Sequence, residues 1–409
     1  MSINTDAKLI DKFLTRGVDK ILPDVDGLRS KLLSGERLTA YMGFDPTGPY
    51  LHVGHAMGIR SLALLQKLGH KVVFLVGDYT ALVGDPDKDS TRKLLTQEEI
   101  ATNMAGWKEQ AGMLIDFEDK DNPVEFASNH QWLSQLKLND LIGLMSKMTV
   151  QQMLERELFQ KRLGENKPLQ LQELIYPLMQ GYDSVAMKVD LELGGTDQIF
   201  NMMVGRDLVR SYLGKDKYVR AHRLMPAPDA LTMSKTKGNG INLADSAQDM
   251  YGKAMSYKDE HILEGLELLT DTHESELEEI ATILKKGENP MQYKKLLAFR
   301  IVELVRGSAA ATEAEQYFQD TVQNRQVSTQ RTKISLKLVN AALLRAGDAT
   351  DPTNIISSLM ESSKGSAKQL IKQGGVEVNS QKCLIDDSIE LAVGDIIKVG
   401  KRNWFEIVD

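Results

Sequence analysis

The stretch that decides the fold is residues 38–55, which read LTAYMGFDPTGPYLHVGH. Its first part, Leu38 to Phe44, is compact and apolar and predicts a strand, and the breaker cluster from Asp45 to Pro49 predicts a turn. From His55 to Leu68 apolar residues recur at helical intervals, and Lys71 to Val76 is a continuous run rich in β-branched residues. The order strand, helix, strand predicts a βαβ unit and hence a buried parallel sheet.

Outward from this unit, the pattern divides the chain into three predicted domains of an α/β protein. Residues 1–223 form a Rossmann-like parallel-sheet domain with an insertion rich in helix formers near 117–164. Residues 224–325 are a helical domain, and residues 333–409 a small α+β module with its own alternation of helix and strand patterns. A polar stretch before the last module predicts a linker.

Composition narrows the class of protein. The chain has 409 residues, a formal charge of -7 and one cysteine, Cys383. A single cysteine excludes an intrachain disulfide and a Cys-rich zinc site and is typical of a reducing compartment. No run is long and apolar enough for an export signal or a membrane span, so a cytoplasmic location is expected. The acidic total argues against indiscriminate nucleic-acid binding, although a local basic face can still hold RNA.

The turn between the first strand and helix carries a candidate phosphate site. His52 and His55 are three residues apart at the start of a helix, where both imidazoles can face a phosphate chain, and Gly54 permits a close approach. The sequence lacks the GxGxxG and GxxxxGK motifs, so the usual dinucleotide and P-loop interpretations fail. An ordinary surface or helix-cap role for the two histidines stays open. A zinc site is disfavoured because no cysteine lies nearby.

Two further stretches combine with the histidines. The loop from Leu231 to Asn239 contains Lys235, whose ammonium group could reach phosphate oxygens, although lysines in loops are usually just solvated. Tyr176, Gln180 and Asp183 have the spacing of a buried helix stripe and yet are polar, which favours a binding role over a solvated face. Pro177 suits a first helical position, so Tyr176 is expected at the helix cap or at a kink.

Taken together, these motifs resemble a known family. HxGH after the first strand, followed much later by Met233-Ser234-Lys235, resembles the HIGH and KMSKS signatures of class I aminoacyl-tRNA synthetases. The stretches 41–45, 176–183 and 194–198 look like those of tyrosyl-tRNA synthetases of the bacterial type. The resemblance runs from about Thr39 through Asn239 and resumes in the last domain.

The resemblance implies a reaction and its partners. In that family the carboxylate of L-tyrosine attacks the α-phosphorus of ATP, which arrives with Mg²⁺, and the tyrosyl group then passes from the adenylate to its tRNA. It also implies a homodimer that pairs through the insertion near 117–164, although the apolar residues there could equally be internal core. The last module resembles a small RNA-binding fold, and Lys364, Lys368 and Lys372 recur on one side of its predicted helix.

The same resemblance assigns roles to individual positions. The expected catalytic residues at the phosphates and nucleotide are Thr47, His52, His55 and Lys235. The phenol hydroxyl is expected between Tyr41 and Asp183, and the ammonium group among Asp85, Tyr176 and Gln180, with Gln198 at the carboxylate end. The expected ATP-binding positions are Gly43, Asp45, Gly54, Gly195, Asp197 and Lys235, and no protein metal site is expected.

Departures from the family pattern and rival functions are also visible. Thr232 stands where the first lysine of KMSKS is usual, and Glu192 stands where many relatives carry glutamine and is left out of the expected site. Lys88 and Arg92 are either further phosphate contacts or plain surface charges. The rivals are a tryptophanyl enzyme, a small-metabolite adenylyltransferase and a synthetase-like RNA-binding protein without catalysis. A pocket that pairs a substrate hydroxyl favours tyrosine, because phenylalanine would leave its polar groups unpaired.

Overall fold

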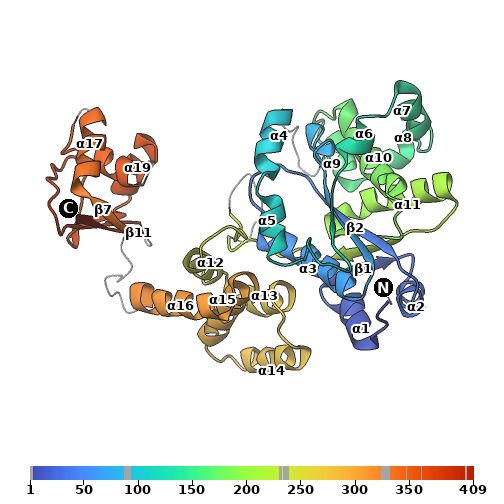
Figure 1. The fold of residues 1–409 in the computed structure, drawn as a ribbon, viewed down its shortest axis with the longest axis horizontal. Coiled ribbons are helices and arrows are strands. Elements are labelled where there is room, and N and C mark those ends of the chain that lie inside the picture. Colours follow the sequence, from blue (N-terminus) through green and yellow to red (C-terminus); the bar gives the residue numbers. More distant parts are fainter. Residues whose placement is uncertain are drawn as a thin grey trace. The chain divides into compact units, whose positions relative to one another are not determined.

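The structure is a computed structural model, and it describes residues 3–86, 94–229, 233, 239–323, 332–346, 348–360, 362–400 and 403–409. The chain forms two compact units, Met1–Thr312 and Glu313–Asp409, which we describe separately (Figure 1). The predicted linker falls largely on residues 324–331, which lie outside the described ranges. The predicted three-domain boundaries stay predictions.

A six-stranded sheet forms the centre of the larger unit, in the order β1-β6-β5-β2-β3-β4. Its strands are β1 Val18–Leu22, β2 Thr39–Phe44, β3 Lys71–Val76, β4 Glu125–Ser128, β5 Leu191–Gly195 and β6 Tyr218–His222. All neighbouring pairs are parallel except β1 and β6, which are antiparallel. The predicted parallel sheet is therefore confirmed, with one antiparallel edge strand that the sequence pattern did not predict.

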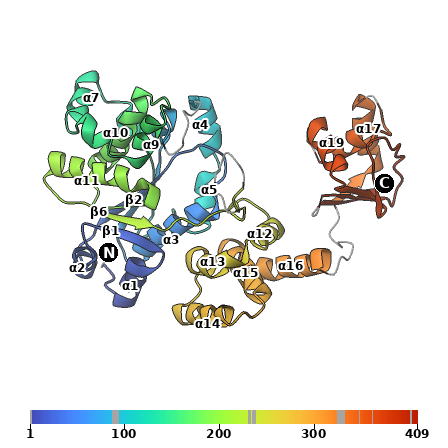
Figure 2. The same cartoon turned by 180° about the vertical axis from the view of Figure 1, so that it is seen from behind.

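Helices cover both faces of this sheet. The connection from β2 to β3 is α3, Val53–Lys67, which lies on one face, whereas α10 (Leu171–Ala186) and α11 (Ile199–Leu213) lie on the other (Figures 1 and 2). The rings of Phe44 and Phe74 stack with centroids 4.5 Å apart, which closes the core beneath the end of β2. The carboxyl ends of β2, β3 and β5 thus meet at one edge, where ligands of open α/β sheets bind.

The remaining helices of the larger unit surround this sheet and continue into a helical region after β6. They are α1 Ala7–Thr15, α2 Val25–Leu33, α4 Gln97–Met104, α5 Trp107–Gly112, α6 His130–Leu133, α7 Leu138–Met145, α8 Val150–Met153, α9 Glu157–Gly164, α12 Ala247–Ala254, α13 Ile262–Leu269, α14 Glu274–Lys285, α15 Met291–Arg306 and α16 Ser308–Phe318, the last of which crosses the boundary between the two units. None of the helices among the described residues is long and apolar enough to cross a membrane.

The structure differs from the sequence-based expectation at two places. Helix α10 begins at Leu171, where Gln170 and Glu173 form a capping box, so Pro177 lies inside the helix and Tyr176 is not at its cap. The capping box supplies a stronger start than the proline does. The predicted helical insertion at 117–164 contains β4, because Glu125–Ser128 pairs with β3 and extends the sheet.

The smaller unit has a separate five-stranded sheet and its own core. The strand order is β7-β11-β10-β8-β9, and three helices pack against the sheet. The elements are β7 Thr332–Ser335, α17 Leu336–Ala346, α18 Pro352–Leu359, α19 Lys364–Lys372, β8 Val376–Val378, β9 Gln381–Lys382, β10 Ile396–Val399 and β11 Asn403–Val408. Ala367 and Ile371 bury one side of α19, whereas the lysines at 364, 368 and 372 are exposed.

Two arginines join the helical region to the sheet region within the larger unit. Arg16, after α1, donates to the carbonyls of Thr270 and Thr272, and Arg60 on α3 donates to the carbonyl of Thr270 and to Asp271. These carbonyls follow the C-terminus of α13, where positive charge is favourable. Lys12 also bonds to Asp271, at 3.0 Å.

We expect Asp271→Asn to destabilise the larger unit by about 1 kcal/mol at neutral pH, a figure that allows for screening of a half-exposed carboxylate. Burial alone would raise the pKa of Asp271, but Arg60 and Lys12 lower it to about 2. A depressed folded-state pKa stabilises above the unfolded value and loses its effect as pH falls. The difference in urea midpoint between wild type and variant should therefore shrink between pH 4 and pH 2, and a constant difference would contradict this account.

Candidate functional site

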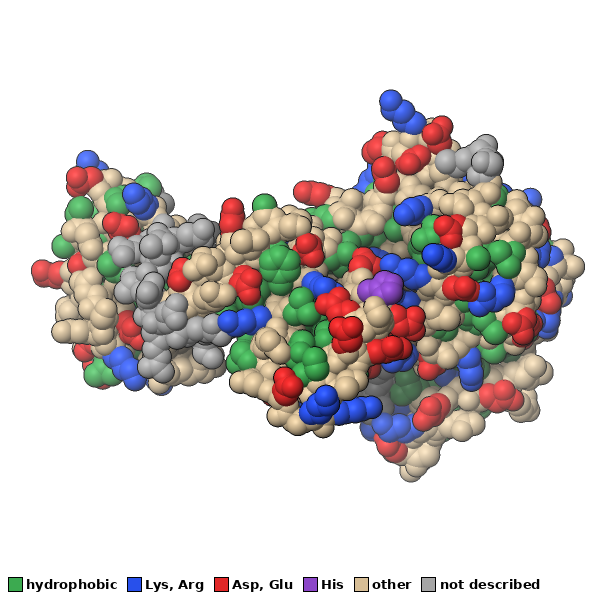
Figure 3. Space-filling view, turned by 90° about the horizontal axis from the view of Figure 1, so that it is seen from below, with side chains coloured by type: hydrophobic (Ala, Val, Ile, Leu, Met, Phe, Trp, Pro, Cys, Tyr) green, Lys and Arg blue, Asp and Glu red, His purple; other side chains and the backbone are tan. Residues whose placement is uncertain are grey.

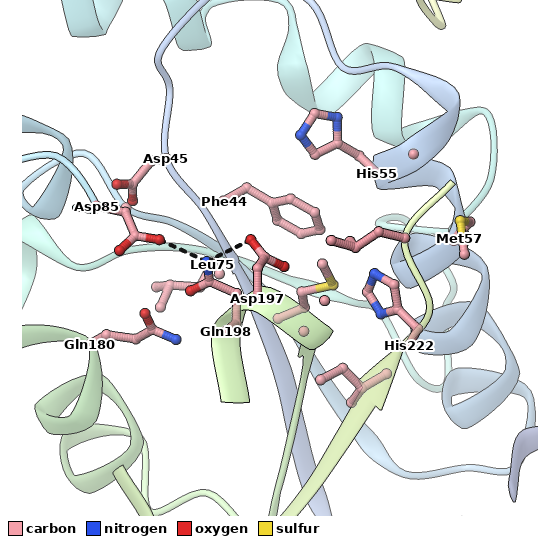
Figure 4. Close-up of a pocket in the computed structure, with 18 of the residues that line it drawn as sticks. Phe44, Asp45, His55, Met57, Leu75, Asp85, Gln180, Asp197, Gln198 and His222 are labelled. Carbon is pink, nitrogen blue, oxygen red and sulfur yellow. Dashed lines mark hydrogen bonds between the residues drawn. The ribbon is translucent and has the colours of Figure 1, made fainter. Parts of the chain in front are cut away.

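Every predicted site residue that the structure describes lines one cavity of about 530 Å³ at the carboxyl edge of the sheet. These residues are Tyr41, Gly43, Asp45, Thr47, His52, Gly54, His55, Asp85, Tyr176, Gln180, Asp183, Gly195, Asp197 and Gln198. Figure 4 shows Asp85 and Gln180 toward one end and His55 and His222 toward the other. Lys235, Lys88 and Arg92 lie outside the described residues. The cavity thus has a carboxylate-and-amide end and an imidazole end.

The imidazole end is built on the N-terminus of α3. His52 is the N-cap residue, and its backbone N–H donates to Nδ1 of His55 at 3.0 Å. A neutral His55 that accepts at Nδ1 carries its proton on Nε2, so that nitrogen is a donor. The two rings lie 3.7 Å apart between centroids. Together with the positive end of the helix dipole, this arrangement favours an anion.

The segment after the Lys235 loop packs against this helix start. The N–H of Val53 donates to the carbonyl of Ile241 at 2.9 Å, and His52 forms an isolated antiparallel bridge with Asn242. Met233, the one described residue between 230 and 238, lines the same cavity. Two stretches that are far apart in the sequence therefore meet at the imidazole end.

Asp45 lines the cavity and joins three elements of the structure, and Figure 4 shows it on the same side as Asp85. Its Oδ2 accepts from the hydroxyl of Tyr176 on α10 at 2.9 Å, and its Oδ1 accepts from the hydroxyl of Thr80 at 2.9 Å. A Cβ atom on Gly77 would lie 2.1 Å from Oδ1, so only glycine leaves room for the carboxylate there. Tyr176 thus holds Asp45, and the phenol proton of Tyr176 is directed at that carboxylate.

Asp85 is a buried carboxylate with three donors around it. Arg156 donates to Oδ1 at 2.8 Å, Gln198 donates to Oδ2 at 2.7 Å, and Asn201 reaches Oδ1 at 3.4 Å. Asn201 also donates to the amide oxygen of Gln180 at 3.0 Å. The amide oxygens and the carboxylate at this end form a group of acceptors, which suits a cationic ammonium group.

Asp183 lies on the wall of the cavity and is 2% exposed. The indole N–H of Trp132, on α6, donates to Oδ1 at 2.8 Å, and the amide of Asn129 donates to Oδ2 at 3.2 Å. Burial raises the pKa of Asp183 well above its usual range, although these two hydrogen bonds oppose the shift. Two fixed donors leave Asp183 as an acceptor toward the cavity.

Tyr41 is the second polar group on that wall. Its hydroxyl lies 3.0 Å from Oγ of Ser184, which in turn contacts the buried pair of Lys217 and Glu192. Burial raises the pKa of Tyr41 well above its usual range, and the charge of Glu192 adds to the shift. Glu192, which the sequence analysis leaves out of the site, also accepts from the amide of Gln180 at 3.1 Å.

Sequence reasoning missed the residues that hold the predicted ones. They are Thr80, Asn129, Trp132, Arg156, Ser184, Asn201 and Lys217. One signal could have found two of them. Asn129 directly follows a strand of the sheet, and Ser184 follows Asp183 on the polar helix, whereas nothing in the sequence distinguishes the others from structural residues.

Comparison with known proteins identifies the family. Residues 33–323 match the family model of class I tRNA synthetases (W and Y). The tyrosine–tRNA ligase of Dehalococcoides mccartyi strain CBDB1 is 38% identical over 99% of this chain and all of its own length. The chain belongs to the tyrosine–tRNA ligase family. The tyrosine–tRNA ligase of Geobacter sulfurreducens is 37% identical and covers 96% of this chain and 97% of its own length.

Solved structures agree on the fold. A C-terminally truncated mitochondrial tyrosyl-tRNA synthetase from Aspergillus nidulans superposes with a TM-score of 0.64 at 21% identity, covering 78% of this chain and 93% of that one. The tyrosyl-tRNA synthetase of Archaeoglobus fulgidus in complex with L-tyrosine gives a TM-score of 0.59 at 21% identity, covering 76% and 99%. The predicted family and fold are both confirmed.

The close approach of Gly77 to Asp45 gives a test of the site's geometry. In Gly77→Ala the new methyl group would displace the Asp45 carboxylate from Thr80 and Tyr176, and small displacements of binding groups reduce rates strongly. We expect kcat/KM for tyrosine-dependent pyrophosphate exchange to fall about tenfold or more. Gly164→Ala, at the end of α9 with open space around the added Cβ, is the control. Equal activity in both variants would contradict a positioning role for Asp45.

Proposed function

We propose that the cavity at the carboxyl edge of the sheet is where the chain activates L-tyrosine with ATP, before the tyrosyl group passes to tRNA. As a member of the tyrosine–tRNA ligase family, the chain attaches tyrosine to tRNA at the expense of ATP. The observation that carries the proposal is the single cavity lined by acceptors for an amino acid at one end and by a helix N-terminus with two histidines at the other.

The first chemical step needs positioning rather than proton transfer. The carboxylate of tyrosine is ionised at neutral pH and attacks the α-phosphorus directly, with pyrophosphate as the leaving group. Catalysis then depends on alignment of the two substrates and on stabilisation of the charge that develops on the phosphate oxygens. Groups whose contacts tighten only in the transition state contribute most to the rate.

At the imidazole end, we assign the phosphates to Thr47, His52 and His55. The Nε2 donor of His55 and the N-terminus of α3 supply positive potential without a mobile charge. Lys235 is proposed to add an ammonium group from the loop whose flanking residues, Met233 and Ile241, reach this end. The nucleotide is assigned to the wall lined by Gly43, Gly54, Gly195 and Asp197, with Asp45 beside it.

At the opposite end, hydrogen-bond direction supports the assignment of the amino acid. Tyr176 donates its proton to Asp45, so its oxygen is left as an acceptor. Asp85 and the amide oxygen of Gln180 are acceptors as well, and the three together suit the ammonium group of tyrosine. Gln198 is proposed at the carboxylate end. Tyr41 and Asp183 face the same cavity and are proposed to hold the phenol hydroxyl.

ATP is used by this family, and we propose that Mg²⁺ accompanies it. Among the described residues, no group of three or more histidine, cysteine or acidic side chains is arranged to hold a metal ion. Mg²⁺ is commonly held by substrate phosphates, water and one or two carboxylates, and we propose Asp45 and Asp197, which both line the cavity, as those carboxylates. The ion would neutralise charge on the leaving pyrophosphate.

Since the substrates are tRNA and ATP, we propose that the chain works in the cytoplasm.

A pyrophosphate-exchange assay tests the assignment of the amino acid. We expect exchange with tyrosine and not with tryptophan or phenylalanine, followed by charging of tRNA. Asp183→Asn places an amide next to the donors Trp132 and Asn129 and removes an acceptor for the phenol, so kcat/KM for tyrosine should fall about tenfold or more. Asp207→Asn, at an exposed position on α11, should behave as wild type. Exchange stimulated by tryptophan alone would refute the tyrosine assignment.

We propose that the smaller unit contacts tRNA through α19. Lys364, Lys368 and Lys372 are exposed on one side of that helix, and phosphate contacts from lysine supply sequence-independent affinity. In contrast, the face of the molecule in Figure 3 has acidic and basic side chains interspersed, without a continuous basic surface. Removal of these lysines is therefore expected to weaken tRNA binding and leave pyrophosphate exchange unchanged.

We also propose a homodimer that pairs through α7 and α8. Four large apolar side chains are exposed there, namely Leu138, Ile142, Met145 and Val150. Leu144 on the same helix is buried, so α7 presents one apolar side to the core and another to solvent. A cluster of exposed apolar side chains is typical of an interaction surface.

Sedimentation velocity tests this surface. The wild-type chain should sediment as a dimer, and Ile142→Glu combined with Met145→Glu should sediment as a monomer, because charged groups would be buried without partners at the interface. Leu171→Glu, at an exposed leucine on α10 outside this patch, is the matched control and should stay dimeric. A double variant that remains a dimer would place the interface elsewhere.

A further inference from the structure

The buried pair of Lys217 and Glu192 lies directly behind the wall that carries Tyr41. Both side chains are essentially inaccessible, at 0% and 1% exposed, and they form an ion pair. Lys217 precedes β6 and Glu192 is on β5, opposite Tyr41 in the register of β2 and β5. Moving two charges from water into a core costs desolvation free energy, so we asked what function the pair serves through its contacts.

The surrounding structure makes room for the lysine and holds it. A Cβ atom on Gly205 of α11 would lie 2.5 Å from Nζ of Lys217, and one on Gly181 of α10 would lie 3.1 Å from the backbone nitrogen of Gly205. Two glycines thus let α10 and α11 cross closely while the ammonium group fits against the crossing. Arg206 donates to the carbonyl of Lys217 at 3.1 Å and fixes its backbone.

From this pair, hydrogen bonds lead to the cavity through one serine. Nζ of Lys217 donates to Oγ of Ser184 at 2.9 Å, and the hydroxyl of Tyr41 lies 3.0 Å from the same atom. Ser184 has a single proton and two candidate acceptors for it, namely Tyr41 and Oε2 of Glu192 at 3.2 Å. Whichever acceptor takes that proton decides whether Tyr41 presents a proton or a lone pair to the cavity.

We propose that Lys217 is a positioning residue that sets the direction of this hydrogen-bond chain and thereby the selectivity for a phenol. Lys217 and Ser184 both reach Oε2 of Glu192, and the ammonium group is the nearer donor, so it weakens the contact of Ser184 there at 3.2 Å. Ser184 then gives its proton to Tyr41, and Tyr41 gives its own proton to the phenol oxygen of the substrate. The substrate hydroxyl can then donate to Asp183, whose two oxygens already accept from Trp132 and Asn129. Donors and acceptors match at every step. The inference rests on the proposed binding of tyrosine in this cavity.

The test is the ratio of kcat/KM for tyrosine to that for phenylalanine in pyrophosphate exchange. Both values come from the same preparation, so the ratio is independent of the fraction of folded enzyme. In Lys217→Met, Oε2 of Glu192 is released, takes the proton of Ser184 and turns Tyr41 into an acceptor. We expect the ratio to fall about tenfold or more, through KM for tyrosine, with KM for ATP unchanged.

A second substitution distinguishes an effect of hydrogen-bond direction at Ser184 from an effect of side-chain packing at position 217. In the double variant E192Q/K217M, the amide oxygen of residue 192 can accept from Gln180 as Glu192 does, so its NH₂ group faces Ser184 and replaces the donor of Lys217. We expect most of the ratio to return although the methionine remains. If Lys217→Met lowers the ratio and the double variant does not recover it, the lysine acts through packing alone and the proposal is wrong.

The controls distinguish a specific effect of Lys217 from a general effect of removing a buried cation, from failure to fold and from failure of the proposed function. Arg162 is a second buried cation, paired with Glu173 near the start of α10, and Arg162→Met should leave the ratio unchanged. If Lys217→Met does not fold, the uncharged double variants E192Q/K217M and E192M/K217M carry the test. Tyr41 is then the remaining acceptor for the proton of Ser184, so the ratio should be kept in both, and a loss in both would contradict the proposal. An unchanged ratio in Lys217→Met overturns the inference. Wild-type enzyme without tyrosine-dependent exchange would instead refute the proposed function.

Discussion

Burying polar side chains of one helix costs free energy unless each finds a hydrogen-bond partner, and this requirement shapes the larger unit. Helix α10 places Tyr176, Asp183 and Ser184 among buried residues, together with the partly buried Gln180, and each polar atom in such a place must find a partner. The partners come from β2 and the turn after it, from the segment after β4, from β5 and from α11. The helix, the sheet and α11 are therefore held in register by hydrogen bonds as well as by apolar packing. The same requirement leaves a cavity whose walls have defined donors and acceptors.

The sequence predicted those parts of the fold that local periodicity encodes. The strand Lys71–Val76 has the predicted bounds, and a helix, α3, joins it to the strand Thr39–Phe44 as the βαβ pattern predicts. The strands β1, β4 and β6 were not predicted. For the edge strands β1 and β4 the reason is that short edge strands gain their stability from pairing with a neighbour and carry little pattern of their own. Of the two positions that Pro177 indicated for Tyr176, the helix cap is wrong, because α10 already begins at Leu171, and the kink stays a prediction.

For the site, the residues that face the cavity were predicted and those that hold them were not. The polar stripe of α10 stood out because it breaks the apolar rule of a buried helix face. Trp132, Arg156 and Asn201 did not stand out, because each is an ordinary residue type in its own segment and becomes significant only through a contact with a residue far away in the sequence. Lys217 was the least predictable of all. A lysine is normally solvated, and no sequence pattern indicates a buried one.

The glycine crossing of α10 and α11 limits how this cavity could be redesigned. Because Gly181 and Gly205 bring the two helices together around an ammonium group, the back wall cannot yield space in the way that an apolar wall does. Trimming Ser184 to admit a bulkier amino acid would remove one acceptor of the buried Lys217 ammonium group, and trimming Tyr41 would leave Ser184 without its contact to the cavity wall. An enlarged binding site therefore requires that the charges at 192 and 217 be removed together, before any side chain that touches the ligand is changed.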